Sequence, residues 1–174
     1  MKCTDHLMQD HKIILRALSV LQCLATIPTG EEIDQKDVSA LLRFLRIFAD
    51  EHHHGKEEDL LFPELMRSSE AQGGPLRHLL FEHDQERSLV AGLEEALRNN
   101  KRVEFFVLAD RVTSRIRNHI EKEDSILFPI LEALISKTQD DKISALFEQL
   151  QIDPELLADL HRLEWKYMRR TTRQ

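Results

Sequence analysis

Two stretches of the sequence, HHGKEEDLLFPEL at residues 53–65 and HIEKEDSILFPIL at residues 119–131, are copies of one motif. Seven of their thirteen positions are identical, and both copies carry a His-x-x-x-Glu pair followed by Leu-Phe-Pro. Such self-similarity indicates a duplicated structural unit. A spacing of four residues places two side chains on one face of a helix, one turn apart. We therefore expect each copy to lie on a helix, with its histidine and glutamate on the same face.

Apolar residues recur at helical spacing around these copies and over most of the chain. We expect helices at about residues 5–27, 34–66, 75–99 and 103–136, with a break at Gln72-Gly73-Gly74-Pro75. Long helices joined by short loops pack as antiparallel neighbours, so the pattern predicts an all-α, up-down-up-down four-helix bundle. An additional C-terminal helical segment follows, with a short piece at about 140–150 and a helix starting at Asp153-Pro154. We expect the bundle domain at residues 1–136, and a C-terminal extension at residues 137–174 that packs on the bundle or on a partner.

The composition excludes several classes of protein. The 174 residues include 24 Lys and Arg against 31 Asp and Glu, a net charge of −7 that argues against a nucleic-acid-binding surface. No stretch approaches the roughly 20 apolar residues of a membrane helix, and the polar N-terminus lacks the apolar core of a signal peptide. The two cysteines, Cys3 and Cys23, form no CxxC pair and suit a reducing compartment. We therefore expect a cytoplasmic protein that binds neither nucleic acid nor a membrane.

The His-x-x-x-Glu pairs are the candidate functional residues. Apolar side chains precede each pair on the same helix face, so both pairs should point into the bundle. Buried carboxylates must be paired or coordinated, and two that face each other repel, so a cation between Glu57 and Glu123 removes both problems. The first and third helices each add one histidine on an apolar face. Four imidazoles and two carboxylates suit iron or another first-row metal better than calcium or magnesium. The predicted ligands are His11, His53, Glu57, His83, His119 and Glu123.

Counting ligands indicates an open centre. If the two glutamates bridge two metals, they fill four positions, the histidines fill four more, and a bridging oxo or hydroxo oxygen fills two. About ten of twelve octahedral positions are then taken, which leaves about two for exogenous ligands or a seventh side chain. Open positions permit chemistry or the binding of a small molecule.

These elements resemble the hemerythrin-like (HHE) cation-binding family over about residues 5–136. The matching elements are Asp10-His11, Glu82-His83 and the two His-x-x-x-Glu motifs with their Leu-Phe-Pro tails. The resemblance implies a four-helix bundle that holds a non-haem di-iron centre, with the four histidines as terminal ligands and the two glutamates as bridges. It also implies a function in binding or sensing O₂ or a related small oxidant such as peroxide or nitric oxide.

The sequence departs from the family on the third helix. Oxygen-carrying hemerythrins supply a fifth histidine there, in a His-x-x-x-His arrangement. In this chain Leu79 and Arg87 occupy the positions four residues from His83, and Glu86 is a candidate carboxylate substitute. The departure favours alternatives to simple O₂ carriage. One is a di-iron enzyme in peroxide or nitric oxide detoxification, or in iron delivery for repair of iron–sulfur clusters; another is a module that contacts a partner or a second copy through its C-terminal helix.

The register of the first motif copy rests on one comparison. By spacing alone, His54 and Glu58 form as good a pair as His53 and Glu57. We assign His53 and Glu57 because Phe62 follows Glu57 by five residues, as Phe128 follows Glu123. His52 and His54 are then rim residues, groups that support the ligands from behind, or solvated helix residues, and we expect the last. Asp10 and Glu82 could orient neighbouring ligands as hydrogen-bond acceptors, but we expect each to be a solvated charge. Of the acidic run at residues 57–59 only the first residue is expected to face inward.

Overall fold

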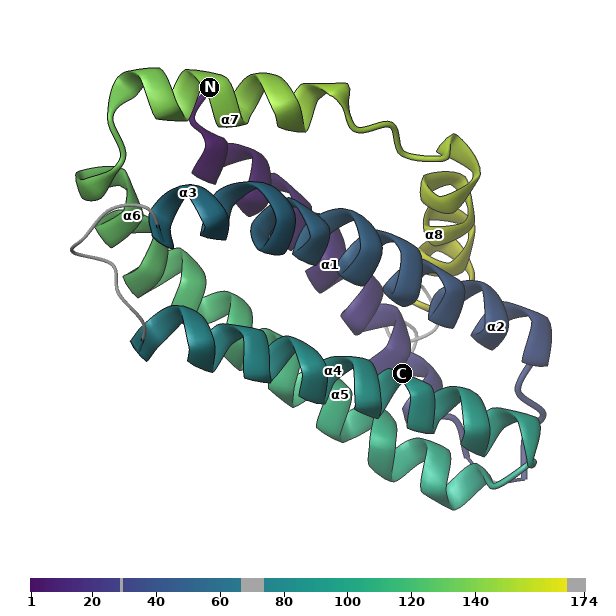
Figure 1. Cartoon of the computed structure of the whole chain (residues 1–174). Coiled ribbons are helices and arrows are strands. Elements are labelled where there is room, and N and C mark those ends of the chain that lie inside the picture. The colour runs from purple at the N-terminus through teal and green to yellow at the C-terminus, as the bar shows by residue number, and fades with distance from the viewer. Residues whose placement is uncertain (29, 67–73, 169–174) are drawn as a thin grey trace.

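The computed structural model describes residues 1–28, 30–66 and 74–168, and these fold into helices without any strand (Figure 1). Each expected helix is present, with ends within three residues of the predicted ones. Of the predicted break at residues 72–75, the first two residues lie outside the described ranges. The elements are α1 (Cys3–Ala25), α2 (Gln35–Phe44), η1 (Leu45–His54), η2 (Lys56–Leu61), α3 (Phe62–Met66), α4 (Gly74–Arg98), α5 (Arg102–Lys122), η3 (Glu123–Leu127), α6 (Phe128–Leu134), α7 (Lys137–Gln149) and α8 (Pro154–Tyr167).

Four long helical stretches, here called rods, precede α7: α1, α2 to α3, α4, and α5 to α6. In two of these rods α-helical and π-helical turns alternate. The stretch from α2 to α3 runs without a break, with Gly55 between the π-helical turns η1 and η2. The stretch from α5 to α6 is built in the same way around η3. Each rod contains one copy of the duplicated motif. Wide π-helical turns inside α-helices are uncommon and are frequent at functional sites.

Local sequence signals set several helix ends. The Asp34 side chain accepts a hydrogen bond from the Lys36 amide at 3.0 Å, so it caps α2. At α8, Asp153 caps the Glu155 amide at 2.9 Å and proline occupies the first turn. Ser136 caps α7, whose start at Lys137 is earlier than the periodicity alone indicated. These caps satisfy amides that have no partner within their own helix.

The helices contact one another in a pattern that suits a hemerythrin-type helical fold. Helix α1 contacts α5 and η1, and α4 contacts α5 and η1 (Figure 1). The C-terminal helices lie on this framework: α7 contacts α1 and η2, and α8 contacts α1 and α2. The apolar side chains Leu156, Leu160 and Leu163 of α8 are buried there. The contacts do not by themselves establish the up-down-up-down order, which stays a prediction, as does the domain boundary at residue 136.

The hydrophobic core consists of two clusters with a polar layer between them. One cluster, the α8-side core, includes Leu18, Phe48 and Val112. The other, the α7-side core, includes Leu7, Phe62 and Phe128. Along α1, His11 falls between residue 7 of the second cluster and residue 14 of the first. The polar layer therefore lies between two apolar cores that separate it from solvent.

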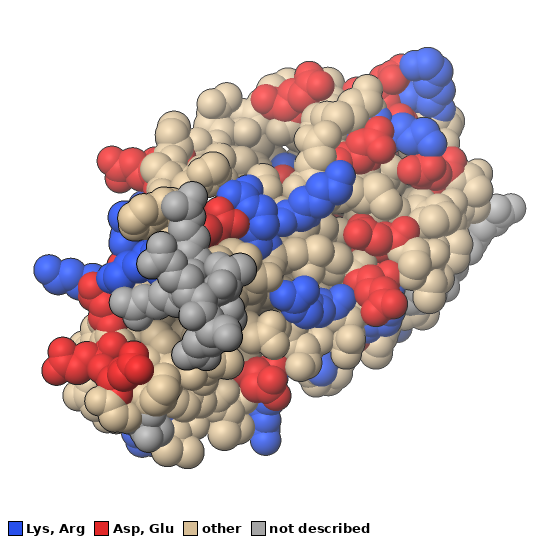
Figure 2. All heavy atoms as spheres, turned by 180° about the vertical axis from the view of Figure 1, so that it is seen from behind, with Lys and Arg blue, Asp and Glu red and all other residues tan. Residues whose placement is uncertain are grey.

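The outer surface carries charges of both signs. On the face seen in Figure 2, Lys and Arg side chains are interspersed with Asp and Glu side chains. None of the helices in the described ranges is both long enough and apolar enough to cross a membrane.

Candidate metal centre

The six predicted ligands meet in the polar layer between the two cores. Each of the four helical rods contributes one histidine, and the two rods with the duplicated motif add Glu57 and Glu123. All six residues are at most 1% exposed. The structure thus brings together residues separated by more than a hundred positions in the chain.

The potential ligand atoms form two groups that share the glutamates. The first group holds His11 and His53 with Glu57 and Glu123, and the second holds His83 and His119 with the same two glutamates. Within each group all ligand atoms lie within 4.8 Å of one another. Shared carboxylates between two histidine pairs are the arrangement that two bridged cations require.

A carboxylate lies at the Nδ1 atom of every histidine in the two groups. For His11, His83 and His119 this second layer leaves the Nε2 atom to face the centre, because a hydrogen bond at one ring nitrogen fixes the tautomer and frees the other nitrogen. The Nδ1 atom of His53 makes no hydrogen bond with the described groups. The Nδ1 distances are 2.7 Å from His11 to Asp124, 2.6 Å from His83 to Glu58, 3.0 Å from His119 to Glu82 and 3.5 Å from His53 to Asp10.

This second layer corrects three expectations. Asp10 and Glu82 are buried behind the histidines and are not solvated charges. Glu58 contacts His83, although only Glu57 of the acidic run was expected to face inward. The signal was present in the sequence: an acidic residue precedes His11 and His83, and another follows each motif glutamate. A helical wheel could not assign them, because the histidine that each one contacts belongs to a neighbouring helix.

Comparison with family models gives one match. A model of the hemerythrin HHE cation-binding domain matches residues 3–131. The chain belongs to the hemerythrin HHE cation-binding family. A comparison with curated proteins finds no match. The matched range of the hemerythrin domain contains both groups of ligand atoms and leaves α7 and α8 outside.

The donor atoms of the hemerythrin domain fit cations. The Nε2 atoms of His11 and His53 lie 3.0 Å apart, and those of His83 and His119 lie 3.2 Å apart. Where both Nδ1 atoms carry the proton, such a contact brings two nitrogen lone pairs together, which a shared cation would relieve. Both oxygens of Glu57 and of Glu123 are buried and accept no hydrogen bond from the described groups. Buried carboxylates without such partners are costly unless they bind a cation.

The pKa values of the cluster reflect this crowding. Burial and the carboxylates of Glu123 and Glu86 raise the pKa of Glu57 well above its usual range. Burial also acts on Glu123, but the imidazoles of His11 and His119 outweigh it and hold the pKa of Glu123 well below its usual range. For His119, contact with Glu123 outweighs burial and raises the pKa to about 9. The cluster alone therefore needs protons to balance its charge, and metal binding would displace them.

The Leu-Phe-Pro tails shape the ends of the centre. The Phe62 amide donates to the Glu57 carbonyl and the Phe128 amide donates to the Glu123 carbonyl, so a π-helical turn follows each glutamate. The proline after each phenylalanine cannot donate to an ordinary α-helical turn, which accounts for the irregularity. Phe128 stacks on His11 with ring centroids 5.5 Å apart, and Phe62 stacks on His83 at 6.2 Å. Both phenylalanines are buried against the ligand histidines.

One residue beside the site differs from the sequence expectation. His54 was expected to be solvated, but it is buried, and one of its ring nitrogens lies within 4.8 Å of ligand atoms of His83 and His119. The Gly55 amide donates to the Asp50 carbonyl, a π-helical bond at the histidine run. This wide turn accompanies the burial of two consecutive histidines. Glu86, which the sequence offered as a substitute ligand, is buried beside His54 with its Oε2 atom 3.5 Å from His54 Nε2.

Proposed function

We propose that this hemerythrin domain holds two non-haem iron ions, and that it binds or senses O₂ or a related small oxidant such as peroxide or nitric oxide there. One observation carries the proposal: four imidazole Nε2 atoms converge on two buried carboxylates that accept no hydrogen bond from the described groups. His11 and His53 would hold the first iron and His83 and His119 the second, with Glu57 and Glu123 between them.

The donor set favours iron over other common metals. Four nitrogens and two carboxylates suit first-row metals, and the absence of cysteine from both groups argues against a structural thiolate zinc site. Calcium and magnesium prefer oxygen ligands and would leave four imidazoles unused. Bound iron would supply a reversible redox change and coordination positions open to a small molecule.

The chain itself orients the imidazoles and buries the proposed ligands. The Nδ1 partners Asp124, Glu58 and Glu82 fix three imidazole tautomers before any metal binds. The stacked phenylalanines and the two apolar cores cover the six residues, which are at most 1% exposed. We further propose that the four rods adopt the alternating up-and-down order of a four-helix bundle, since that order lets each rod place one histidine at the same level.

The test is the metal content of the purified protein. The protein is reconstituted with ferrous iron, its metal is measured by elemental analysis, and its visible absorption is recorded in air. We expect about two irons per chain, and a loss of iron in His53→Ala and Glu123→Ala. His161→Ala and Glu121→Ala, which replace exposed residues of the same types, are the matched controls. One zinc per chain, or no bound metal, would refute the proposal.

The same material separates binding from catalysis. Reduced protein is mixed with O₂, peroxide or nitric oxide, and the spectrum is followed together with consumption of the added molecule. A spectral change that reverses when the molecule is removed supports binding or sensing. Sustained consumption beyond the amount of protein supports a di-iron enzyme instead. A contact with a partner or a second copy through α7 and α8 would be identified by a change in oligomeric state or partner binding on deletion of residues 137–174, with the iron spectrum retained.

A further inference from the structure

A cavity of about 200 Å³ extends from the surface to His54 and Glu86, which lie beside the second histidine pair. It lies between η1 and α4, with Ile116 of α5 at its inner side. Its lining passes from the exposed residues Arg46 and Ala91 to the buried residues His54 and Glu86. A larger cavity of about 370 Å³, at Phe105, is lined by neither His54 nor Glu86.

We propose that this cavity is the entry route for the small ligand, and that His54 and Glu86 receive the ligand beside the second metal position. The inference rests on the proposed di-iron function and assigns the ligand to one of its two positions. That position is the one formed by His83 and His119.

The walls define the class of molecule that fits. Leu45, Ala49 and Val90 make the route largely apolar. A carboxylate, Glu86, stands at its inner end and disfavours anions. A volume of about 200 Å³ is several times the share of one water molecule, which is roughly 30 Å³ in the liquid. The route therefore suits a small uncharged molecule such as O₂ or nitric oxide.

Glu86 and His54 point polar atoms at the end of this route. Both oxygens of Glu86 are buried and make no hydrogen bond with the described groups. The nearest ring nitrogens are His54 Nε2 at 3.5 Å and His119 Nδ1 at 3.9 Å. The Nδ1 atom of His54 is occupied by Asp50 at 3.2 Å, so its Nε2 atom is the one that faces inward. Unsatisfied buried polar atoms at the end of a cavity indicate a place where a polar or polarisable ligand is held.

The orientation of His54 argues that it contacts the ligand and not the metal. Its ring is stacked on His83, with centroids 3.8 Å apart and planes 11° from parallel. A metal lies close to the ring plane of each imidazole that binds it, and two nearly parallel stacked planes meet only far from both rings. His54 and His83 therefore do not suit the same ion in this arrangement. The second position then has only two histidines and keeps room for an exogenous ligand.

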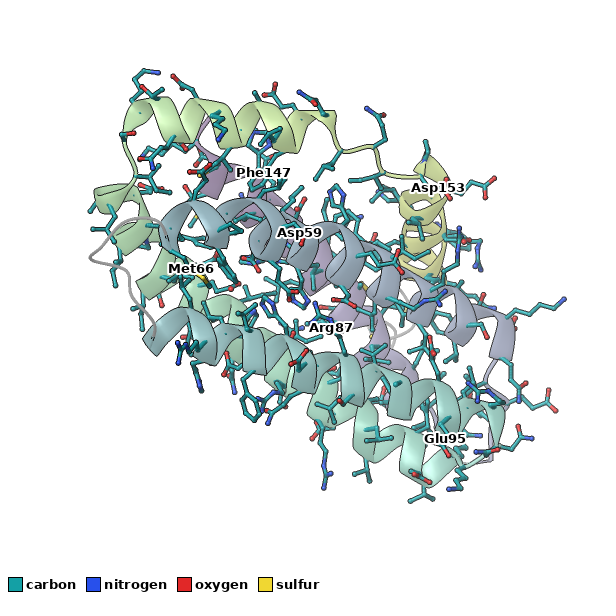
Figure 3. The ribbon with its side chains drawn as sticks, viewed as in Figure 1. Asp59, Met66, Arg87, Glu95, Phe147 and Asp153 are labelled. Atoms are coloured by element: carbon teal, nitrogen blue, oxygen red, sulfur yellow. The ribbon has the colours of Figure 1, made fainter. Side chains whose placement is uncertain are left out.

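Arg87 lines the cavity and holds one of its walls in place. Its guanidinium donates to Asp50 at 2.7 Å and to Glu58 at 2.6 Å, and it lies between α4 and the η1–η2 stretch (Figure 3). Asp50 holds His54, and Glu58 holds His83. One cation thus ties the wall of the cavity to the second layer of the metal centre.

The route is tested by narrowing it in the iron-loaded full chain. Val90→Phe narrows the cavity from its wall, and Ala91→Phe blocks its exposed mouth without crowding the core. Val107→Phe, on the exposed face of α5, is the matched control. Nitric oxide association with the reduced protein is measured by stopped-flow absorption, beside iron content. We expect association to slow about tenfold in the two plugged variants, an added barrier of about 1.4 kcal/mol, with iron content and control unchanged. Unchanged association in both plugged variants with full iron would overturn the route.

The receiving pair is tested by His54→Phe, which keeps a ring on His83 and removes Nε2. We expect full iron content and nitric oxide dissociation about tenfold faster than in the wild type. Loss of one iron in this variant would identify His54 as a metal ligand and overturn its assignment to the ligand pocket. A wild-type protein without iron would instead refute the proposed function itself, so the two failures are distinguishable.

Discussion

Replacing Glu58 tests the second layer of the centre without touching a proposed ligand. Its Oε1 atom accepts from His83 Nδ1 and from Arg87 Nη2, both at 2.6 Å. In Glu58→Ala, His83 loses the partner that fixes its tautomer, while Arg87 keeps Asp50 at 2.7 Å. Loss of such a partner typically lowers metal affinity by about 10–100-fold, or about 1.4–2.7 kcal/mol. Because His83 belongs to one group of ligand atoms only, we expect the second iron to be lost first.

The assay is competition for iron against a chelator, with iron per chain measured at each chelator concentration. Wild type should release both irons over one range, whereas Glu58→Ala should pass through a plateau of about one iron per chain. Glu58→Gln keeps an acceptor oxygen and should recover part of the affinity. Asp59→Ala, the exposed neighbour, is the matched control. Equal affinity in Glu58→Ala and Asp59→Ala would show that the hydrogen bond to His83 does not support metal binding.

Three further outcomes are expected. Phe128→Ala removes a fully buried ring that stacks on His11, so it should lower the free energy of unfolding by about 3–5 kcal/mol in a urea titration; a loss below 1 kcal/mol would contradict its packing role. Burial alone raises the pKa of Asp37, but its contacts with α8, Lys166 first, outweigh burial and lower that pKa to about 2. Asp37→Asn should therefore cost about 1–2 kcal/mol at pH 7, a difference that shrinks as the pH falls below about 4 toward 2; a difference independent of pH would contradict it. Free iron at 100 times its Kd should stabilise the folded protein by about 2.7 kcal/mol per site, and a chelator that removes the iron should abolish this stabilisation. An unchanged melting temperature after chelation would show that iron does not stabilise the fold.

The helices and the six converging residues could be predicted because both follow from periodicity within single helices. Apolar spacing placed the ends of each helix within three residues, and i,i+4 spacing placed each motif histidine beside its glutamate. The comparison of the two motif copies favoured His53 and Glu57, and these two residues lie in one group of potential ligand atoms. Whether these residues bind metal stays a prediction.

The second layer and the burial of His54 could not be predicted in the same way. Asp10 acts on His53 and Glu82 acts on His119, each across a helix–helix contact whose rotation a single helix does not specify. His54 is buried where the helix widens into π-helical turns, which an α-helical wheel of 3.6 residues per turn does not describe. These contacts depend on the rotation of one helix against another or on π-helical turns, and neither follows from the spacing of residues on a regular α-helix.

The two motif copies also share a lysine that is not a predicted ligand. Each copy has a lysine three residues after its histidine: Lys56 donates to Asp10 at 2.6 Å, and Lys122 pairs with Glu82. Each lysine therefore supports the carboxylate that lies behind the histidine of its own copy. Each carboxylate behind a histidine is thus paired with an ammonium group, and this balances acidic residues that would otherwise repel Glu57 and Glu123.

One of the six positions at which the two copies differ lies on the cavity. The residue after the motif histidine is His54 in the first copy and Ile120 in the second, and both side chains are buried. A polar ring therefore stands beside the second histidine pair, whereas the repeat places only an apolar side chain at the equivalent position. Two metal positions built from equivalent ligands would thus differ in their surroundings. This difference, and not the ligand set, is what would direct a small molecule to one iron of the pair.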